Sequence, residues 1–339
     1  MRTLGRIVGN WSRVVAFVSI VIVALTSPTF AIELNAGKYG ATLYWWYERL
    51  PDTAIYPPTI SWDAREAAWW VNVVRQAQDA GLGWLAPGCW GEGSNADPAT
   101  LGPLVTAIDK TAPNIKLALF DDTTSEVLRK NRARGRGWTV DVPFDLADIA
   151  GTGDGGLAYF YDQQWKRFFQ TVPPRNRLTI DGRPVVFMWH GGFESYEHQN
   201  FFHAMLESLR HATERDFNID PFVIVEESWV RLDPATHADA IYDWFQPERI
   251  FATLMSWNGV RVGHVVPGYD CSRCNPAGPV VSRQNGALYQ AGLQAVAADS
   301  DLVLIEALNN VDENAHLMES RAWGRLYLTI TKWFSSNVP

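Results

Sequence analysis

Acidic side chains follow several short apolar segments of this sequence, at the point where each segment ends. Glu226 and Glu227 follow residues 222–225, and Glu306 follows residues 302–305, with Glu313 close behind. Two carboxyl groups whose pKa values are pushed apart can cleave a glycosidic bond, one as the acid and the other as nucleophile or base. The predicted catalytic residues are Glu306, Glu226, Glu313 and Glu227.

The adjacent pair Glu226–Glu227 has a second interpretation. Successive residues of a strand point to opposite sides, so we expect only one of the two to face a pocket and the other to form a salt bridge. Glu306 could likewise be a hydrogen-bonding support for another group. The same acids could also hold a metal ion, but no His-rich spacing accompanies them, and we predict neither a metal nor a cofactor.

Aromatic and polar residues at the other segment ends could bind a sugar, because sugar C–H faces stack on aromatic rings and hydroxyls need polar partners. About half of the 16 Trp residues are expected in the core, with Trp165 and Trp333 among them. Asp121 and Asp122 could instead cap the next helix, and His190 suits an orienting donor. The predicted substrate-binding residues are Trp45, Trp46, Trp90, Asp121, Asp122, His190, Trp229, Asp243, Tyr269, Asp270 and Asn309.

Eight β-type segments alternate with mostly helical patterns, which predicts an α/β protein with a (β/α)8 barrel as a single domain over residues 32–339. The segments are 39–46, 83–90, 115–120, 184–190, 222–225, 240–245, 262–266 and 302–305. An open doubly wound sheet is the rival, disfavoured because no Gly-rich phosphate loop follows the first segment. A barrel gathers the ends of its strands at one mouth, where we expect a common pocket lined by Trp45, Asp121, Glu226 and Glu306.

The spacers carry their own helix signals. Asp63, with Glu66 three residues later, predicts the start of one helix, and Asp97–Pro98 predicts another. A short helix is expected after Pro247. The closing helix is expected to contain Leu317, Trp323, Leu326 and Ile330.

Residues 1–31 have the pattern of a signal peptide, with three Arg, an apolar run from Val14 to Leu25, and a small-residue cleavage site ending at Ala31. The alternative is a membrane anchor, but the apolar run is short for a bilayer. We therefore predict a secreted or periplasmic protein without a stable membrane anchor.

The charge of the chain limits its partners. Residues 1–31 hold three Arg and no acidic residue, so their removal changes the formal net charge from −8 to −11. Such a surface repels polyphosphates, and no basic stripe is present, which argues against nucleic acid. A neutral or cationic poly- or oligosaccharide fits better, and the oligomeric state stays open.

Three cysteines occur, and two of them, Cys271 and Cys274, have a spacing that permits a disulfide with a tight turn. We predict that these two pair and that Cys89 stays reduced beside Trp90. Three free thiols are the alternative.

Three motifs resemble those of the endo-α-mannosidase and α-1,3-glucanase groups of glycoside hydrolases, and of related bacterial domains of unknown function. They are Gly81–Gly91, with an aromatic residue after the second strand; Leu178–Phe187, which is similar to an "idGrPvv" strand entry; and Ala307–Ser320, which stands where those families carry a "WNEWxEGTxIEPS"-like stretch. The resemblance implies a barrel fold, hydrolysis of a glycan and catalytic acids after the eighth strand.

One motif departs from this pattern. Asn309 matches the Asn of the motif and Glu313 its second Glu, but Asn310 stands at the position of the first Glu. Either Glu306 or a Glu after the fifth strand takes the missing role, or the protein is a non-catalytic glycan-binding barrel.

Overall fold

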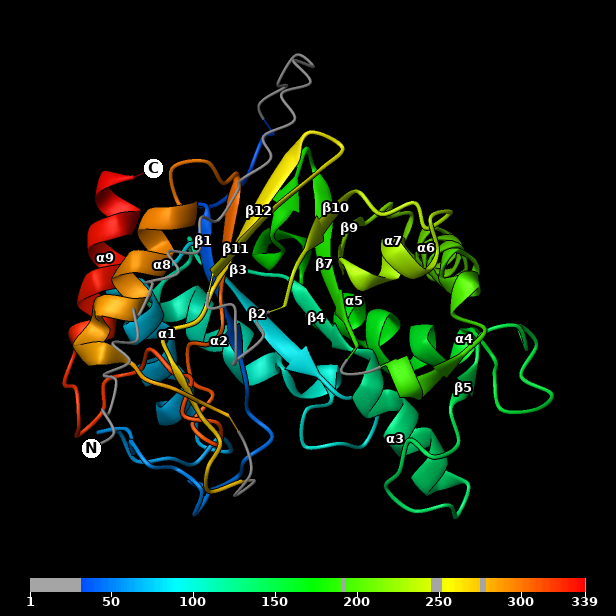
Figure 1. Ribbon diagram of the computed structural model, residues 1–339, viewed down its shortest axis with the longest axis horizontal. Coiled ribbons are helices and arrows are strands. Elements are labelled where there is room, and N and C mark those ends of the chain that lie inside the picture. The colour runs from blue at the N-terminus through cyan, green and yellow to red at the C-terminus, as the bar shows by residue number, and fades with distance from the viewer. Residues whose placement is uncertain (1–31, 191–192, 245–251, 275–278, 339) are drawn as a thin grey trace, which may run out of the picture. The chain divides into compact units, whose positions relative to one another are not determined.

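Eight parallel strands form the centre of the computed structural model, which describes residues 32–190, 193–244, 252–274 and 279–338 (Figure 1). The strands are β1 (Tyr39–Leu43), β2 (Trp84–Cys89), β4 (Leu119–Asp122), β7 (Arg183–Trp189), β9 (Phe222–Glu226), β10 (Ala240–Tyr242), β12 (Val260–Val265) and β15 (Leu302–Ile305). They pair in the order β10-β9-β7-β4-β2-β1-β15-β12. This nearly closed sheet confirms the predicted barrel.

The shorter strands extend or flank this sheet. β11 (Ala252–Trp257) pairs antiparallel with β12, and β6 (Thr179–Ile180) pairs antiparallel with β7. The others are β3 (Lys116–Leu117), β5 (Phe144–Asp145), β8 (Tyr196–Glu197), β13 (Tyr269–Asp270) and β14 (Val280–Val281). Pro247 and the residues directly after it, where a short helix was expected, lie outside the described residues, and the strand β11 begins at Ala252.

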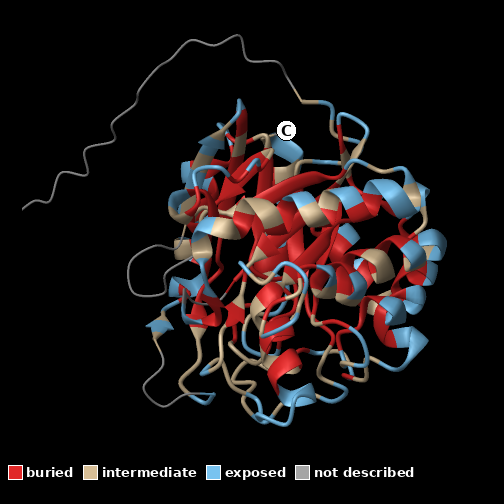
Figure 2. Cartoon of the chain, turned by 90° about the vertical axis from the view of Figure 1, so that its right-hand side faces the viewer, coloured by how far each residue is buried: buried red, intermediate tan, exposed pale blue. Residues whose placement is uncertain are grey.

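Helices cover the outside of the strands (Figure 1). They are α1 (Ala67–Asp79), α2 (Gly102–Thr111), α3 (Thr123–Ala133), α4 (Ala158–Phe160), α5 (Lys166–Thr171), α6 (Phe202–Phe217), α7 (Ser228–Leu232), α8 (Ala287–Val296) and α9 (Leu326–Asn337). A π-helical turn (Tyr161–Trp165) joins α4 to α5. Figure 2 shows that buried residues lie along the strands and on one side of the helices.

Two expectations about the aromatic core have opposite outcomes. Trp165 is fully buried, as predicted, whereas Trp333 is 54% exposed and that prediction is wrong. The buried face of α9 contains Tyr327, Leu328 and Phe334, and Trp333 lies on the face turned to solvent. The helix begins at Leu326, so the expected earlier start is also wrong.

The strands have two different faces, and this decides which side chains reach the mouth. Alternate residues such as Ile224 and Leu304 point into the barrel and form an interior core. The residues between them, such as Val225 and Ile305, pack against the helices in a second core. Continuing the alternation, Glu226 and Glu306 lie on the interior side.

The described residues belong to one compact unit, Ala31–Pro339. The predicted signal peptide, residues 1–31, lies outside the described residues. Within the described part of the chain, no helix has the length and apolar character needed to cross a membrane.

Candidate active site

A cavity of about 470 Å³ lies at the C-terminal ends of the barrel strands. It is bounded by residues at the ends of β1, β2, β4, β7 and β10 and by the segment after β15. Its lining residues are Tyr44, Trp46, Tyr47, Trp90, Phe120, Asp122, Trp189, Trp244, Tyr269, Glu306, Asn310, Asp312 and Glu313. This set unites Glu306 and Glu313, two of the four predicted catalytic residues.

Asn310 connects the two carboxyl groups. Its Nδ2 donates to Glu306 Oε1 at 3.2 Å and to Glu313 Oε2 at 2.7 Å. Because both oxygens contact the same nitrogen, they are no more than roughly 6 Å apart, close to the separation of roughly 5–5.5 Å in retaining glycosidases. The arrangement can therefore place two carboxyl groups around one glycosidic bond.

Glu306 is the deeper carboxyl group and is 1% exposed. The hydroxyl of Tyr44 donates to both of its oxygens at 2.9 Å, and Thr42 donates a further hydrogen bond. Burial, together with the charge of Glu313, raises the pKa of Glu306 to about 8, although the hydrogen bond from Thr42 opposes the shift.

Glu313 is the more accessible of the two. The hydroxyl of Tyr269 donates to its Oε1 at 2.9 Å. Burial raises the pKa of Glu313, and the hydrogen bonds from Tyr269 and Asn310 oppose that rise. A buried pair in which each carboxyl group disfavours ionisation of the other suits acid–base chemistry.

Tryptophan rings form the walls of the cavity. Trp46 and Trp90 stack with ring centroids 4.2 Å apart at an interplanar angle of 19°. Trp189 and Trp244 lie 5.4 Å apart. Such flat surfaces match the C–H faces of sugar rings.

Asp122 has two functions in this arrangement. Its Oδ1 accepts from the backbone N–H of Ser125 at 3.1 Å, which caps α3, and its Oδ2 accepts from Trp90 Nε1 at 2.9 Å. Burial raises the pKa of Asp122 to about 6. The carboxyl group thus both starts a helix and fixes a tryptophan of the cavity wall.

Glu226, the third predicted catalytic residue, does not line the cavity. Its Oε2 accepts from the backbone N–H of Ser228 at 3.1 Å and from the Ser228 hydroxyl. That hydroxyl also lies 2.8 Å from His190 Nε2. Burial raises the pKa of Glu226 to about 7. The three side chains form a separate hydrogen-bonded chain at the ends of β7 and β9.

The alternation of strand residues explains why other candidates lie elsewhere. Asp121 points to the outer face, where its Oδ2 accepts from Trp165 Nε1 at 2.8 Å. Glu227 pairs with Arg231 Nε at 3.1 Å, which is the salt bridge expected for one member of the Glu226–Glu227 pair. The expected common pocket is therefore wrong for Asp121, and Glu227 is turned away from the cavity.

Two tryptophans from the predicted binding set are packed in the core. Trp45 is 4% exposed and donates from Nε1 to Thr100 Oγ1 at 3.2 Å. Trp229 is fully buried and lies 4.2 Å from the ring of Phe202. Neither lines the cavity, so the expected common pocket is wrong for Trp45 as well.

The remaining predicted residues surround the cavity without lining it. Asn309 is fully buried and bonds through its amide to both backbone groups of Tyr44, at 2.7 Å and 2.6 Å. Asp243 is half-buried beside β11 and lies outside the cavity. Asn309 positions Tyr44 and, through it, the donor to the deeper carboxyl group.

Asp270 lines a second cavity of about 290 Å³ that shares only Tyr269 with the first. The loop that follows contains the disulfide Cys271–Cys274, with a Cα–Cα distance of 5.1 Å, and Cys89 is free and buried. The predicted pairing is confirmed. The bridge closes the loop directly after Tyr269, which donates to a cavity carboxyl group.

The predicted catalytic and binding residues do not include several residues that line the cavity: Tyr44, Tyr47, Phe120, Trp189, Trp244, Asn310 and Asp312. The alternation of strand residues could have indicated two of them. Trp189 lies two residues after Phe187, and Trp244 lies two residues after Tyr242, and both Phe187 and Tyr242 point into the barrel. Asn310 had no such signal, since its importance follows from two contacts across a loop.

Several solved structures have a fold similar to that of this chain. Two structures of the GH99 endo-α-mannosidase from Bacteroides thetaiotaomicron, one in complex with BIS-TRIS-propane, match with TM-scores of 0.59 and 0.58 at 15% and 13% identity. Each match covers 89% of this chain and 97% of the other. A glycoside hydrolase-like protein matches with a TM-score of 0.56 at 18% identity, covering 91% and 97%. At these identities the likeness shows a shared fold.

The sequence matches the model of a protein family. No curated protein matches it. The model of a family described as "Domain of unknown function (DUF5010)" matches residues 26–338, nearly the whole chain. The chain therefore belongs to the DUF5010 family.

Proposed function

We propose that this protein is a glycoside hydrolase that cleaves a poly- or oligosaccharide in the cavity at the barrel mouth. The observation that carries the proposal is the pair Glu306–Glu313, bridged by Asn310 and buried among tryptophan rings. The fold shared with the GH99 endo-α-mannosidase supports it. If residues 1–31 are removed on export, as their pattern predicts, the protein acts outside the cytoplasm.

The two carboxyl groups take different parts in the proposed reaction. Burial raises the pKa of both, so the pair holds a proton at neutral pH that a glycosidic oxygen can accept. Glu313, the more exposed, contacts the substrate. Glu306, held by Tyr44 and Thr42, provides the second carboxyl group beneath it.

The test is release of reducing ends by the purified full-length chain from a panel of bacterial, fungal and plant polysaccharides. Glu313→Gln and Glu306→Gln are each expected to lower the rate by roughly 10²–10⁴, the usual contribution of a positioned acid or base. Glu227→Gln is the matched control, because that carboxyl group pairs with Arg231 outside the cavity. Rates unchanged in both cavity variants would refute the assignment.

A non-catalytic glycan-binding function is the competing proposal, and Asn310 favours it because it replaces the first Glu of the resembling motif. In that case the panel yields no reducing ends, although a polysaccharide still binds to the tryptophan walls. Binding without hydrolysis across the panel would support this second function.

A further inference from the structure

The cavity has an unusual balance of charge. Its described lining residues include four with carboxyl groups, Asp122, Glu306, Asp312 and Glu313, and no Lys, Arg or His. The other lining residues are eight aromatic side chains and one amide. This one-sided composition bears on the charge of the ligand that the cavity prefers.

The partners of the four carboxyl groups are neutral. Among the described residues, none of the four forms an ion pair with Lys, Arg or His. The partners are Trp90 and Ser125 for Asp122; Thr42, Tyr44 and Asn310 for Glu306; Thr53 for Asp312; and Tyr269 and Asn310 for Glu313. Any of these groups that is ionised therefore carries a negative charge that no basic side chain of the described residues compensates.

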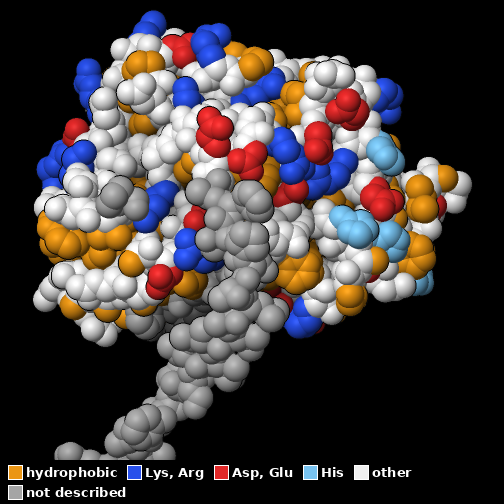
Figure 3. Space-filling view, turned by 90° about the horizontal axis from the view of Figure 1, so that it is seen from above, with side chains coloured by type: hydrophobic (Ala, Val, Ile, Leu, Met, Phe, Trp, Pro, Cys, Tyr) orange, Lys and Arg blue, Asp and Glu red, His pale blue; other side chains and the backbone are white. Residues whose placement is uncertain are grey.

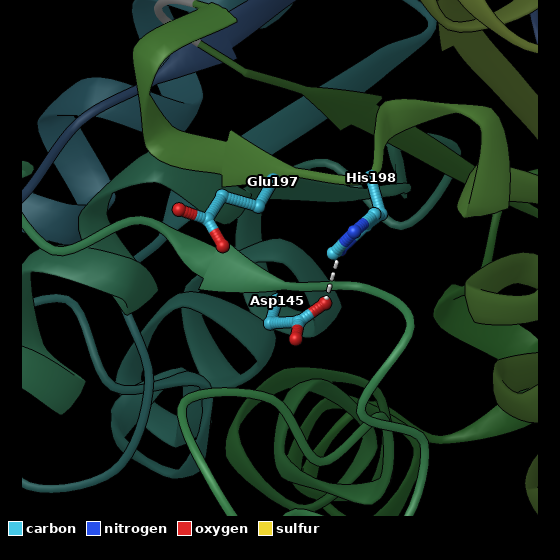
Figure 4. A group of neighbouring side chains, drawn as sticks. All are labelled: Asp145, Glu197 and His198. Atoms are coloured by element: carbon cyan, nitrogen blue, oxygen red, sulfur yellow. Dashed lines mark hydrogen bonds and ion pairs between the residues drawn. The ribbon is translucent and has the colours of Figure 1, made fainter.

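A metal ion is a poor counter-charge for these groups. In the described part of the chain, one set of three side chains brings its ligand atoms within 4.8 Å of one another: Asp145, Glu197 and His198 (Figure 4). These residues lie on and after the β5–β8 pair, with His198 Nδ1 2.7 Å from Asp145 Oδ1, and none lines the cavity. The described acids of the cavity do not come together in this way.

An ammonium group is well suited to such a cavity. Carboxylates attract it through Coulomb forces that are strong where water is excluded, and the faces of tryptophan and tyrosine rings attract it through cation–π interaction. A carboxylate or sulfate on the ligand would be repelled by the same groups. On the face seen in Figure 3, by contrast, acidic and basic side chains are mixed.

We infer that the cavity selects a hexosamine with a free ammonium group, as found in a glycan that is at least partly de-N-acetylated. The inference rests on the proposed function only in taking this cavity as the sugar-binding site. It concerns binding rather than cleavage, so it can hold or fail independently of hydrolysis.

The experiment measures binding by quenching of tryptophan fluorescence in the full-length protein. The probes are glucosamine, galactosamine and mannosamine, as monosaccharides and as available oligosaccharides, each compared with its N-acetylated form at neutral pH, where Asp122 is mostly ionised. At least one free amine is expected to bind about tenfold or more tightly than its N-acetylated form, a difference of about 1.4 kcal/mol. The preference should decrease with added salt.

Asp312→Asn tests the charge without changing the proposed catalytic pair. It keeps a side-chain oxygen for Thr53 and removes one negative charge, so we expect the preference for the free amine to fall severalfold. Asp145→Asn, which neutralises a carboxyl group outside the cavity, should leave the preference unchanged. Equal or tighter binding of the N-acetylated forms, or no binding of any free amine, would overturn the inference. Hydrolysis that fails while the preference holds would refute the proposed function alone.

Discussion

Replacing Glu306 by Gln should make the stability of this protein less dependent on pH. Glu306 is 1% exposed, and burial raises its pKa to about 8 from its ordinary value of 4.5. Between these two pH values the folded chain keeps a proton at this site that the unfolded chain releases. Deprotonation therefore favours the unfolded chain, and stability falls as the pH rises from about 4.5 to about 8. Because Gln does not titrate, the variant does not lose this part of its stability as the pH rises.

The size of the effect follows from the shift. One pKa unit corresponds to about 1.4 kcal/mol, so the whole interval is worth about 4–5 kcal/mol. That figure is an upper limit, because Glu313 titrates together with Glu306 and takes part of the proton exchange. At the acidic end both proteins carry a neutral group at this position, and their free energies of unfolding should be similar.

The measurement is urea unfolding of the wild type and Glu306→Gln at pH 4.5 and pH 8. The variant should gain stability relative to the wild type by up to about 4 kcal/mol between the two conditions. Buried acids that do not interact with Glu306 are common to both proteins and cancel in the difference, whereas the changed titration of Glu313 reduces the gain below this upper limit. Glu227→Gln, in the ion pair with Arg231, serves as the control. A stability difference that is the same at both pH values would refute the reasoning.

Three further outcomes can be checked directly. Trp90→Ala removes one ring of the stacked pair and should weaken glycan binding about two- to tenfold in a titration, whereas Trp90→Phe should retain most of it. Alkylation of the denatured, unreduced protein should label Cys89 alone, and all three thiols after reduction of Cys271–Cys274, as read by intact mass; three labels without reductant would contradict the disulfide. Arg283→Met should lower the free energy of unfolding by about 2–3 kcal/mol, because Arg283 donates to two backbone carbonyls between β15 and α9; a loss below about 0.5 kcal/mol would contradict that role.

The barrel could be predicted from the sequence because its strands are short, apolar and separated by helices with a clear buried face. The segment after Asp97 is an example: Asp97 accepts from the backbone N–H of Ala99 at the start of a 3₁₀ turn (Pro98–Thr100), and Leu104 and Ile108 of the following α2 are buried, as their spacing predicts. The strand Ala252–Trp257 could not be found in this way, since it is only partly buried and pairs antiparallel with its neighbour.

The site was predicted less well because proximity to a strand end does not determine direction. Asp121 and Asp122 are adjacent, yet one packs behind the barrel with Trp165 and the other lines the cavity. A shift of one residue reverses the side of the sheet to which a side chain points. Direction follows from alternation with residues known to lie inside the barrel, such as Phe120, and those are established only when the whole sheet is assembled.

The structure also distinguishes the two groups that could replace the Glu missing at position 310. Glu226 is held by Ser228 and the neighbouring histidine and does not line the cavity. Glu306 lines it and shares the amide of Asn310 with Glu313. An amide can donate to two carboxylates at once, whereas a carboxylate at position 310 would repel both. Asn310 is therefore compatible with a carboxyl pair made by Glu306 and Glu313. The chain has Asn where the resembling motif has its first Glu, and it has an acid, Glu306, four residues earlier.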